Sequence, residues 1–124
     1  KLSKLSSRPN LELVGQSFSV NSFIVTATLA EVKALRYTPA GLPALDLELI
    51  HQSEVSDQGK SRQVGLQLRA VAFGAMAEKL RNQAVGSEWQ FSGFMAAAKA
   101  KPTLSKQIVF HIQDFQTVPK LPVQ

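Results

Sequence analysis

The sequence lacks cysteine, which excludes disulfide bonds and metal sites built on thiolates. It has no Gly-rich phosphate loop, because Gly59 and Gly65 fit no nucleotide-binding motif. Its only histidines, His51 and His111, have no partner at a metal-ligand spacing. No apolar run approaches the roughly 20 residues that a membrane-spanning helix needs. We therefore expect no cofactor, no metal and no membrane partner.

Acidic residues are fewer than basic ones. The chain has 14 Lys and Arg against 9 Asp and Glu, a formal net charge of +5. This excess indicates a polyanionic partner, although a modest excess would also serve solubility. Residues 1–10 (KLSKLSSRPN) are basic, but no apolar run follows them as in a secretory signal. We expect one domain, because 124 residues do not divide into two, and a cytoplasmic protein.

A predicted hairpin at residues 36–51 (RYTPAGLPALDLELIH) organises the chain. Pro39 fixes φ at an early turn position, and Gly41 can adopt a positive φ without steric cost. After the turn, every second residue is leucine and acids stand between them, which predicts a strand with one buried face. The leucines are Leu45, Leu47 and Leu49, and the acids are Asp46 and Glu48.

The same alternation predicts the other strands. The first strand carries inward residues Phe23, Val25, Ala27 and Leu29 and continues past Val32 towards Arg36. The second strand covers 42–53, and a polar hairpin loop follows at 54–60. The third strand covers 62–72; its outward row is polar and basic, and its inward residues are Val64, Leu66, Leu68 and Ala70. The predicted order continues with a helix at 74–83 and a strand at 87–96. A basic loop at 97–106 then leads to a last strand at 107–115, which has Ile108, Phe110 and Ile112 on one face.

Five strands with one short helix between the third and fourth predict an all-β fold. This β-β-β-α-β-β order is that of a five-stranded OB-fold Greek-key barrel, which commonly binds oligonucleotides. An SH3-like barrel or a split sandwich also fits the pattern. We expect the OB-fold domain at 21–118 and a tail at 119–124. Residues 1–20 are expected to form an N-terminal arm, flexible or adding an edge strand at 11–14.

Three segments carry a family resemblance: RYTPAGLPALDLELIHQS, FGAMAEKLRN and GSEWQFSGF. They resemble the bacterial single-stranded-DNA-binding protein OB-fold superfamily. The TPAGLP turn, the Ile50-His51 strand end and the loop KAKPTLSK are closer to the primosomal replication protein N (PriB) family. The resemblance covers roughly residues 22–116. It implies a homodimer that binds single-stranded DNA in the primosome and stimulates the PriA-type helicase in replication restart.

The resemblance also implies a DNA-binding set. Lys99, Lys101 and Lys106 match the family's DNA-contacting loop, and Arg36 matches a basic position before the turn. Arg62 opens the third strand on the same expected face. Lys60 and Gly65 stand where the family often has stacking aromatics, which indicates a site that depends more on charge. Independently of the family, lysines along a loop can follow a phosphate backbone, or can simply be solvated.

The aromatic residues divide between core and surface. Trp89 and Phe91 share a strand face and are expected in the core, whereas Phe94 points the other way beside the basic loop and is the best stacking candidate. Tyr37, next to Arg36, is expected to contact the ligand, to pack against the turn or to lie in a dimer interface. For the homodimer, outward residues of the first strand offer a surface to a second copy: Ile24, Thr26 and Thr28.

Two other functions remain as alternatives. A general replicative single-strand binder typically adds a disordered linker and an acidic tip, whereas this sequence has no acid after Asp114 and ends LPVQ. An enzyme is not expected, because Asp46 and Glu48 lack a second cluster that would complete an acid–base or metal site. We interpret them as residues of a solvated or interface strand face.

Overall fold

The computed structural model describes residues 19–98 and 107–119. Within them the chain forms six strands and one helix. In order these are β1 (Phe23–Val32), β2 (Arg36–Tyr37), β3 (Pro43–Asp57), β4 (Lys60–Phe73), α1 (Ala75–Arg81), β5 (Glu88–Ala97) and β6 (Ile108–Gln116). No helix in the described part of the chain is long and apolar enough to cross a membrane.

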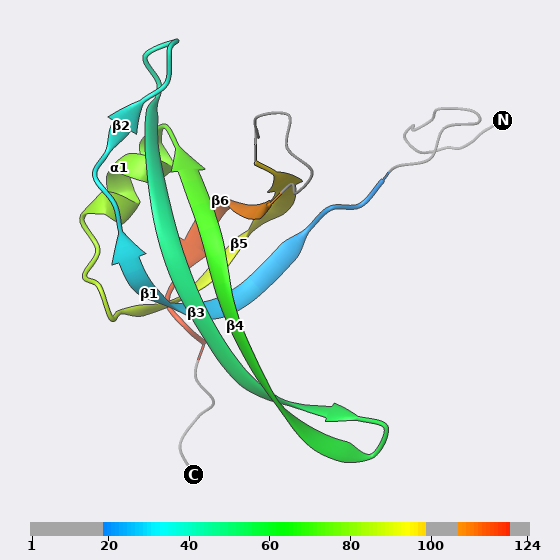
Figure 1. Cartoon of the computed structure of the whole chain (residues 1–124). Helices are drawn as coiled ribbons and strands as arrows, with labels where there is room; N and C mark the ends of the chain where they lie inside the picture. The colour runs from blue at the N-terminus through cyan, green and yellow to red at the C-terminus, as the bar shows by residue number, and fades with distance from the viewer. Residues whose placement is uncertain (1–18, 99–106, 120–124) are drawn as a thin grey trace, which may run out of the picture.

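The five long strands close into a barrel, as Figure 1 shows. The strand order is β1-β5-β6-β4-β3-β2, and an additional pairing of β1 with β3 closes the ring. The β4–β6 pair is parallel, and the other pairs are antiparallel. With its single helix between β4 and β5, this arrangement is the predicted OB-fold, and the prediction of fold class is confirmed.

The barrel interior is filled by the residues that the alternation pointed inward. Leu29, Leu45, Leu49, Phe91 and Phe110 have no exposed surface. Burial of each such side chain stabilises the fold by about 1.5–3 kcal/mol relative to leaving it in water. The helix α1 adds Ala77 and Leu80 to the same core. Trp89 is only partly buried and packs against this core.

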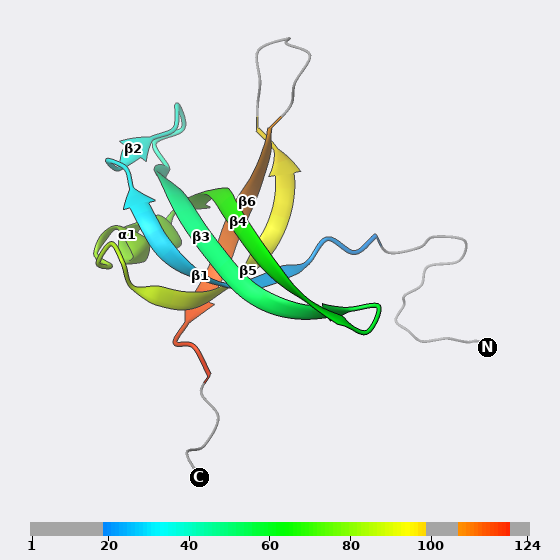
Figure 2. The ribbon, with the colours of Figure 1, turned by 60° about the horizontal axis from the view of Figure 1, so that its bottom comes forward.

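The prediction of a polar hairpin loop at 54–60 is wrong. Both strands continue through it, and only Gln58 and Gly59 form the turn, with φ of 55° and 77°. Cross-strand pairs of side chains hold the extension, including Arg62 with Asp57 and Ser61 with Glu54. Polar residues alternate on both faces here because this part of the β3–β4 hairpin projects beyond the barrel (Figures 1 and 2).

Three predicted core residues are therefore exposed. Val64 and Leu66 lie on the projecting hairpin and are 37% and 40% exposed. Ile108 is 65% exposed, because β6 pairs with β4 only at Phe110 and His111, and among the described residues Ile108 has β5 alone as a paired neighbour. Alternation identifies which residues share a face, but it does not show where the covering layer ends.

The first strand and the helix are shorter than predicted. β1 ends at Val32, and Arg36 belongs to the separate strand β2. The register of β1 against β3 shifts between Leu29 and Glu31, a bulge that accompanies a bend in the strand. The helix ends at Arg81, two residues before the predicted end. Predictions for residues 1–18, 99–106 and 120–124 lie outside the described residues.

Candidate nucleic-acid interface

A groove of about 730 Å³ lies on the outer face of the barrel. The link between β1 and β2, the β2–β3 turn, and strands β3, β4, β5 and β6 all contribute to its lining. In Figures 1 and 2, the β2–β3 turn and the adjoining ends of β5 and β6 lie at the same end of the molecule, opposite the tip of the β3–β4 hairpin. The groove therefore belongs to that end of the barrel.

The β2–β3 turn forms one rim of the groove. The amide of Gly41 donates to the carbonyl of Thr38 at 2.8 Å, and the amide of Leu42 donates to Thr38 Oγ1 at 3.1 Å. Gly41 has a φ of 85°, as the sequence predicted for this position. The closed turn leaves Tyr37 on the rim with 63% of its surface exposed, so its ring is accessible to a ligand in the groove.

The groove floor carries charges of both signs. Arg36 binds Asp46 through two hydrogen bonds, Nε to Oδ2 at 2.7 Å and Nη2 to Oδ1 at 3.1 Å. The hydrogen bond from Arg36 is the main reason that the pKa of Asp46 lies below its ordinary value; burial opposes it, and the charges of Lys33 and Arg69 add to it. Asp46 is therefore ionised at neutral pH.

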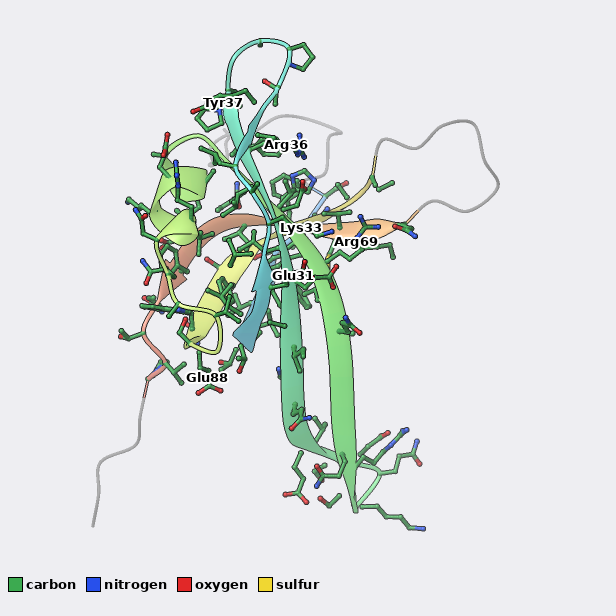
Figure 3. All side chains as sticks on the ribbon, turned by 60° about the vertical axis from the view of Figure 1, so that its left-hand side comes forward. Glu31, Lys33, Arg36, Tyr37, Arg69 and Glu88 are labelled. Atoms are coloured by element: carbon green, nitrogen blue, oxygen red, sulfur yellow. The ribbon has the colours of Figure 1, made fainter. Side chains whose placement is uncertain are left out.

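Two basic residues in the groove remain available for a ligand. Lys33 is placed by its backbone amide, which donates to the carbonyl of Asp46 at 3.0 Å. Arg69 stands opposite Glu48 in the β3–β4 register, and Glu48 accepts a hydrogen bond from Gln67. Among the described residues, neither Lys33 nor Arg69 has an ion-pair partner. In the view of Figure 3, Lys33 and Arg69 are labelled close together, with Arg36 and then Tyr37 further towards the β2–β3 turn.

Three aromatic rings form a row from the groove across the barrel surface. The ring centroids of Phe73 and His111 are 5.8 Å apart with an interplanar angle of 31°, and those of His111 and Phe94 are 4.7 Å apart at 13°. Phe73 and His111 line the groove. Burial lowers the pKa of His111 below its ordinary value. A row of π faces beside basic groups suits planar, anionic ligands such as nucleotides.

The structure separates the predicted DNA-binding residues into two regions. Arg36 and Tyr37 line the groove, and Phe94 adjoins it through His111. Lys60 and Arg62 lie at the tip of the β3–β4 hairpin. The predicted DNA-binding residues of the basic loop, Lys99, Lys101 and Lys106, lie outside the described residues. The flanking positions are described, and Ala98 donates its amide to the carbonyl of Gln107 at 2.8 Å while lining the groove wall.

Arg62 was predicted on the same face as Arg36, and this placement is wrong. The unbroken β3–β4 register puts Arg62 opposite Val55. By the alternation of β4, Arg62 shares the face of Leu68, which points into the barrel further along the strand. Its guanidinium pairs with Asp57 at 2.9 Å. Arg62 is thus remote from the groove and on the other face of the sheet.

Sequence reasoning missed Lys33, Phe73 and His111 as site residues. Arg69 belongs to the outward row of β4 that the sequence showed to be polar and basic, but it was not selected as a site residue. His111 could have been linked to Phe94, because antiparallel strands joined at 97–106 bring the two outward rows together, and the structure pairs these residues directly. Phe73 and Lys33 gave no such signal, since closure of the barrel brings them to the groove.

The other histidine is held in a structural role. Nδ1 of His51 donates to the carbonyl of Thr26 at 2.6 Å, because a carbonyl oxygen can only accept. In the neutral ring with this tautomer, Nε2 accepts from Ser53 Oγ at 2.9 Å. In the residues that the structure describes, no group of three or more His, Cys, Asp or Glu could hold a metal ion.

Comparison with known proteins agrees with this geometry. Residues 21–114 match the model of a family described as another single-strand binding protein family. The replication restart protein PriB of Bordetella pertussis is 39% identical over 99 residues, covering 80% of this chain and 90% of that protein. PriB of Nitrosomonas europaea is 32% identical over 102 residues, covering 82% and 92%. The solved structure of PriB from Ralstonia solanacearum superposes with a TM-score of 0.70 at 32% identity, covering 80% of this chain and 98% of that one.

The closed barrel, its outer groove and the family match define an OB-fold of the single-strand binding protein class. Within this class, the chain belongs to the family of the replication restart protein PriB. The family resemblance predicted from the hairpin, helix and β5 segments is confirmed.

Proposed function

We propose that this protein binds single-stranded DNA in the groove and, as a dimer, stimulates a PriA-type helicase during replication restart. The observation that carries the proposal is the groove itself, where Lys33 and Arg69, which form no ion pair within the described part of the chain, lie in one lining with the rings of Tyr37 and Phe73. The names of the relatives, replication restart protein PriB, supply the cellular process.

The groove suits a single strand better than a duplex. Cationic side chains neutralise phosphates without reading sequence, whereas exposed rings require unpaired bases whose faces are free to stack. Base–aromatic stacking contributes about 1–3 kcal/mol per base and tolerates any base. We therefore expect weak base preference. In this account the loop with Lys99, Lys101 and Lys106, which follows Ala98 in the sequence, adds phosphate contacts.

The homodimer is supported by an open strand edge. Among the described residues, β1 pairs with β5 from Phe23 to Thr28, but on its other side its strand pairing with β3 begins only at Thr28, preceded by the side-chain contact of His51 with the Thr26 carbonyl. Beside this edge, Ile24 is 64% exposed. An unpaired edge next to exposed apolar surface is normally covered in a native assembly. A second copy pairing along this part of β1 would cover both features.

The proposal is tested with DNA-binding and helicase measurements on the full chain. Fluorescence anisotropy should show tighter binding of labelled single-stranded oligonucleotides than of duplex of the same length. Sedimentation should give a dimer, and saturating protein should raise the unwinding rate of the cognate PriA-type helicase. Equal or tighter duplex binding would contradict the groove site, and unchanged unwinding would contradict the helicase role alone.

One alternative remains for the helicase experiment to decide. The family model that matches is described only as a single-strand binding protein family, so a general replicative single-strand binder fits the same groove. Such a protein would bind single strands and raise the unwinding rate only by preventing the separated strands from pairing again. An unrelated single-strand binding protein at the same DNA coverage is the matched control.

A further inference from the structure

His111 stands in the middle of the aromatic row, at the wall of the groove. Phe73 approaches it from β4 and Phe94 stacks on it from β5, at the distances given above. Phe73 and His111 line the groove, whereas Phe94 lies beyond its lining. The row therefore leads from the groove over β6 to β5, away from the β3–β4 hairpin. A strand of DNA that follows it leaves the groove across the barrel surface.

Among the three rings, only that of His111 changes its charge near neutral pH. Two effects on that charge oppose each other. Contact with the face of a phenyl ring stabilises an imidazolium. Burial between the strands disfavours the charge and lowers the pKa of His111. In the free protein burial prevails, so the ring is neutral at pH 7.

The charged groups facing His111 come from every side of the groove. Those that line the groove with it are Arg69 on β4, Asp46 and Glu48 on β3, and Lys33 and Arg36 before the turn, whereas Asp114, three residues further along β6, is not part of the lining. β5 contributes the uncharged side chains of its outward row, Ser92, Phe94 and Ala96. Asp46 is paired with Arg36, and burial is the one cause of the lowered pKa of His111, with no contribution from an acid of the groove in the free protein. Phosphates of a bound strand would supply that negative charge.

We infer that His111, packed between Phe73 and Phe94, belongs to the single-strand site and that DNA binding is coupled to proton uptake on its ring. The inference rests on the proposed function. Phosphates in the groove favour the imidazolium and offset the cost of its burial, so the complex holds a proton that the free protein does not. By linkage, the affinity for single-stranded DNA rises as the pH falls.

The first test measures oligo-dT binding by anisotropy from about pH 8 to about pH 5.5, the range in which histidine titrates. Thymine does not titrate there, so the response comes from the protein. If DNA raises the pKa of His111 by one unit, affinity increases about tenfold across the range. The salt dependence should also steepen by about 0.7 at the acid end, because one more phosphate is neutralised.

Three variants locate the proton. His111→Phe keeps a ring in the row but cannot titrate, and it should flatten the pH profile. His111→Gln should flatten the profile and also weaken binding, because it removes the ring that packs between Phe73 and Phe94 and holds the row together. His51→Gln is the matched control, since His51 is the only other histidine of the chain and is hydrogen-bonded to Thr26 and Ser53 away from the groove. It should keep the wild-type profile.

A measurement on the unmodified protein keeps the test independent of variant folding. NMR of the histidine ring signals should show the pKa of His111 rising when oligo-dT is added. An unchanged His111 titration, or a wild-type profile in His111→Phe, would overturn the inference. Absence of oligo-dT binding at every pH would instead contradict the proposed function, whereas binding with a flat profile contradicts only the role of His111.

Discussion

Arg36 and Asp46 form a bidentate ion pair on the floor of the groove, with hydrogen bonds of 2.7 Å and 3.1 Å. The pair joins β2 to β3, next to the backbone pairing of Arg36 with Ala44. Because a bidentate carboxylate occupies the guanidinium, Arg36 offers a phosphate less than its full charge. Lys33 and Arg69, which have no ion-pair partner among the described residues, are then the main cations of the groove floor.

Replacement of Asp46 by Asn tests the pair through its pH dependence. Both side chains are partly exposed, at 50% and 39%, so solvent screening limits the loss at neutral pH to about 0.5 kcal/mol. The pKa of Asp46 is lower in the folded than in the unfolded chain. The ionised Asp46 therefore stabilises the folded protein fully above the pKa of the unfolded chain, about 4. This stabilisation disappears as the pH falls through the pKa of the folded state. Urea unfolding of both proteins at neutral and acid pH should show this convergence. A difference that grows in acid would contradict it.

Replacement of Gly93 by Ala should destabilise the barrel beneath the aromatic row. A Cβ at this position would lie 1.8 Å from the carbonyl oxygen of His111 and 2.9 Å from its carbon. Backbone atoms of β6 cannot move aside as a flexible side chain can, so we expect a loss of about 2 kcal/mol or more. Gly65→Ala is the control, because its Cβ meets nothing within 4 Å. Equal stability of the two variants in urea would show that β5 and β6 separate more easily than the structure implies.

The basic loop is tested by replacing Lys99, Lys101 and Lys106 together with Ala. If each neutralises one phosphate, the salt slope for single strands falls in magnitude by about 2. At about 0.1 M salt this corresponds to at most about a hundredfold weaker binding. The loss should be equal for oligo-dT and mixed sequences, since phosphate contacts carry no base information. Anisotropy over a salt series measures both quantities, and an unchanged slope would exclude the loop from the site.

Lys60 and Arg62 should affect only the binding of long strands. Asp46 and Asp57 are eleven residues apart on β3, which corresponds to about 35 Å of strand. A short oligonucleotide in the groove therefore does not reach the hairpin tip, whereas a long one can. Lys60→Ala with Arg62→Ala should leave the affinity for short oligo-dT unchanged and weaken that for long oligo-dT. Weaker binding of short strands would show that the tip is part of the primary site.

The sequence predicted those features in which neighbours along the chain determine the structure. The alternation around Leu45 and Leu49 identified the core face of β3, and Pro39 with Gly41 identified the turn. The length of the hairpin was missed because its polar alternation at 54–60 continues without a buried face. The groove was missed in part because Lys33, Arg69 and His111 lie far apart in the sequence and come together only when β1 pairs with β3 and β6 pairs with β4.

The most direct test of the groove compares two double variants that each remove two positive charges. Lys33→Ala with Arg69→Ala changes the groove floor, and Lys79→Ala with Arg81→Ala changes the last turn of α1. Anisotropy with labelled oligo-dT over a salt series gives the affinity and the salt slope of each. We predict that the groove variant binds at least tenfold more weakly, with a slope reduced by about 1.4 for two phosphate contacts, while the helix variant stays close to wild type. Retained affinity and slope in the groove variant, with both lost in the helix variant, would place the DNA site elsewhere on the barrel.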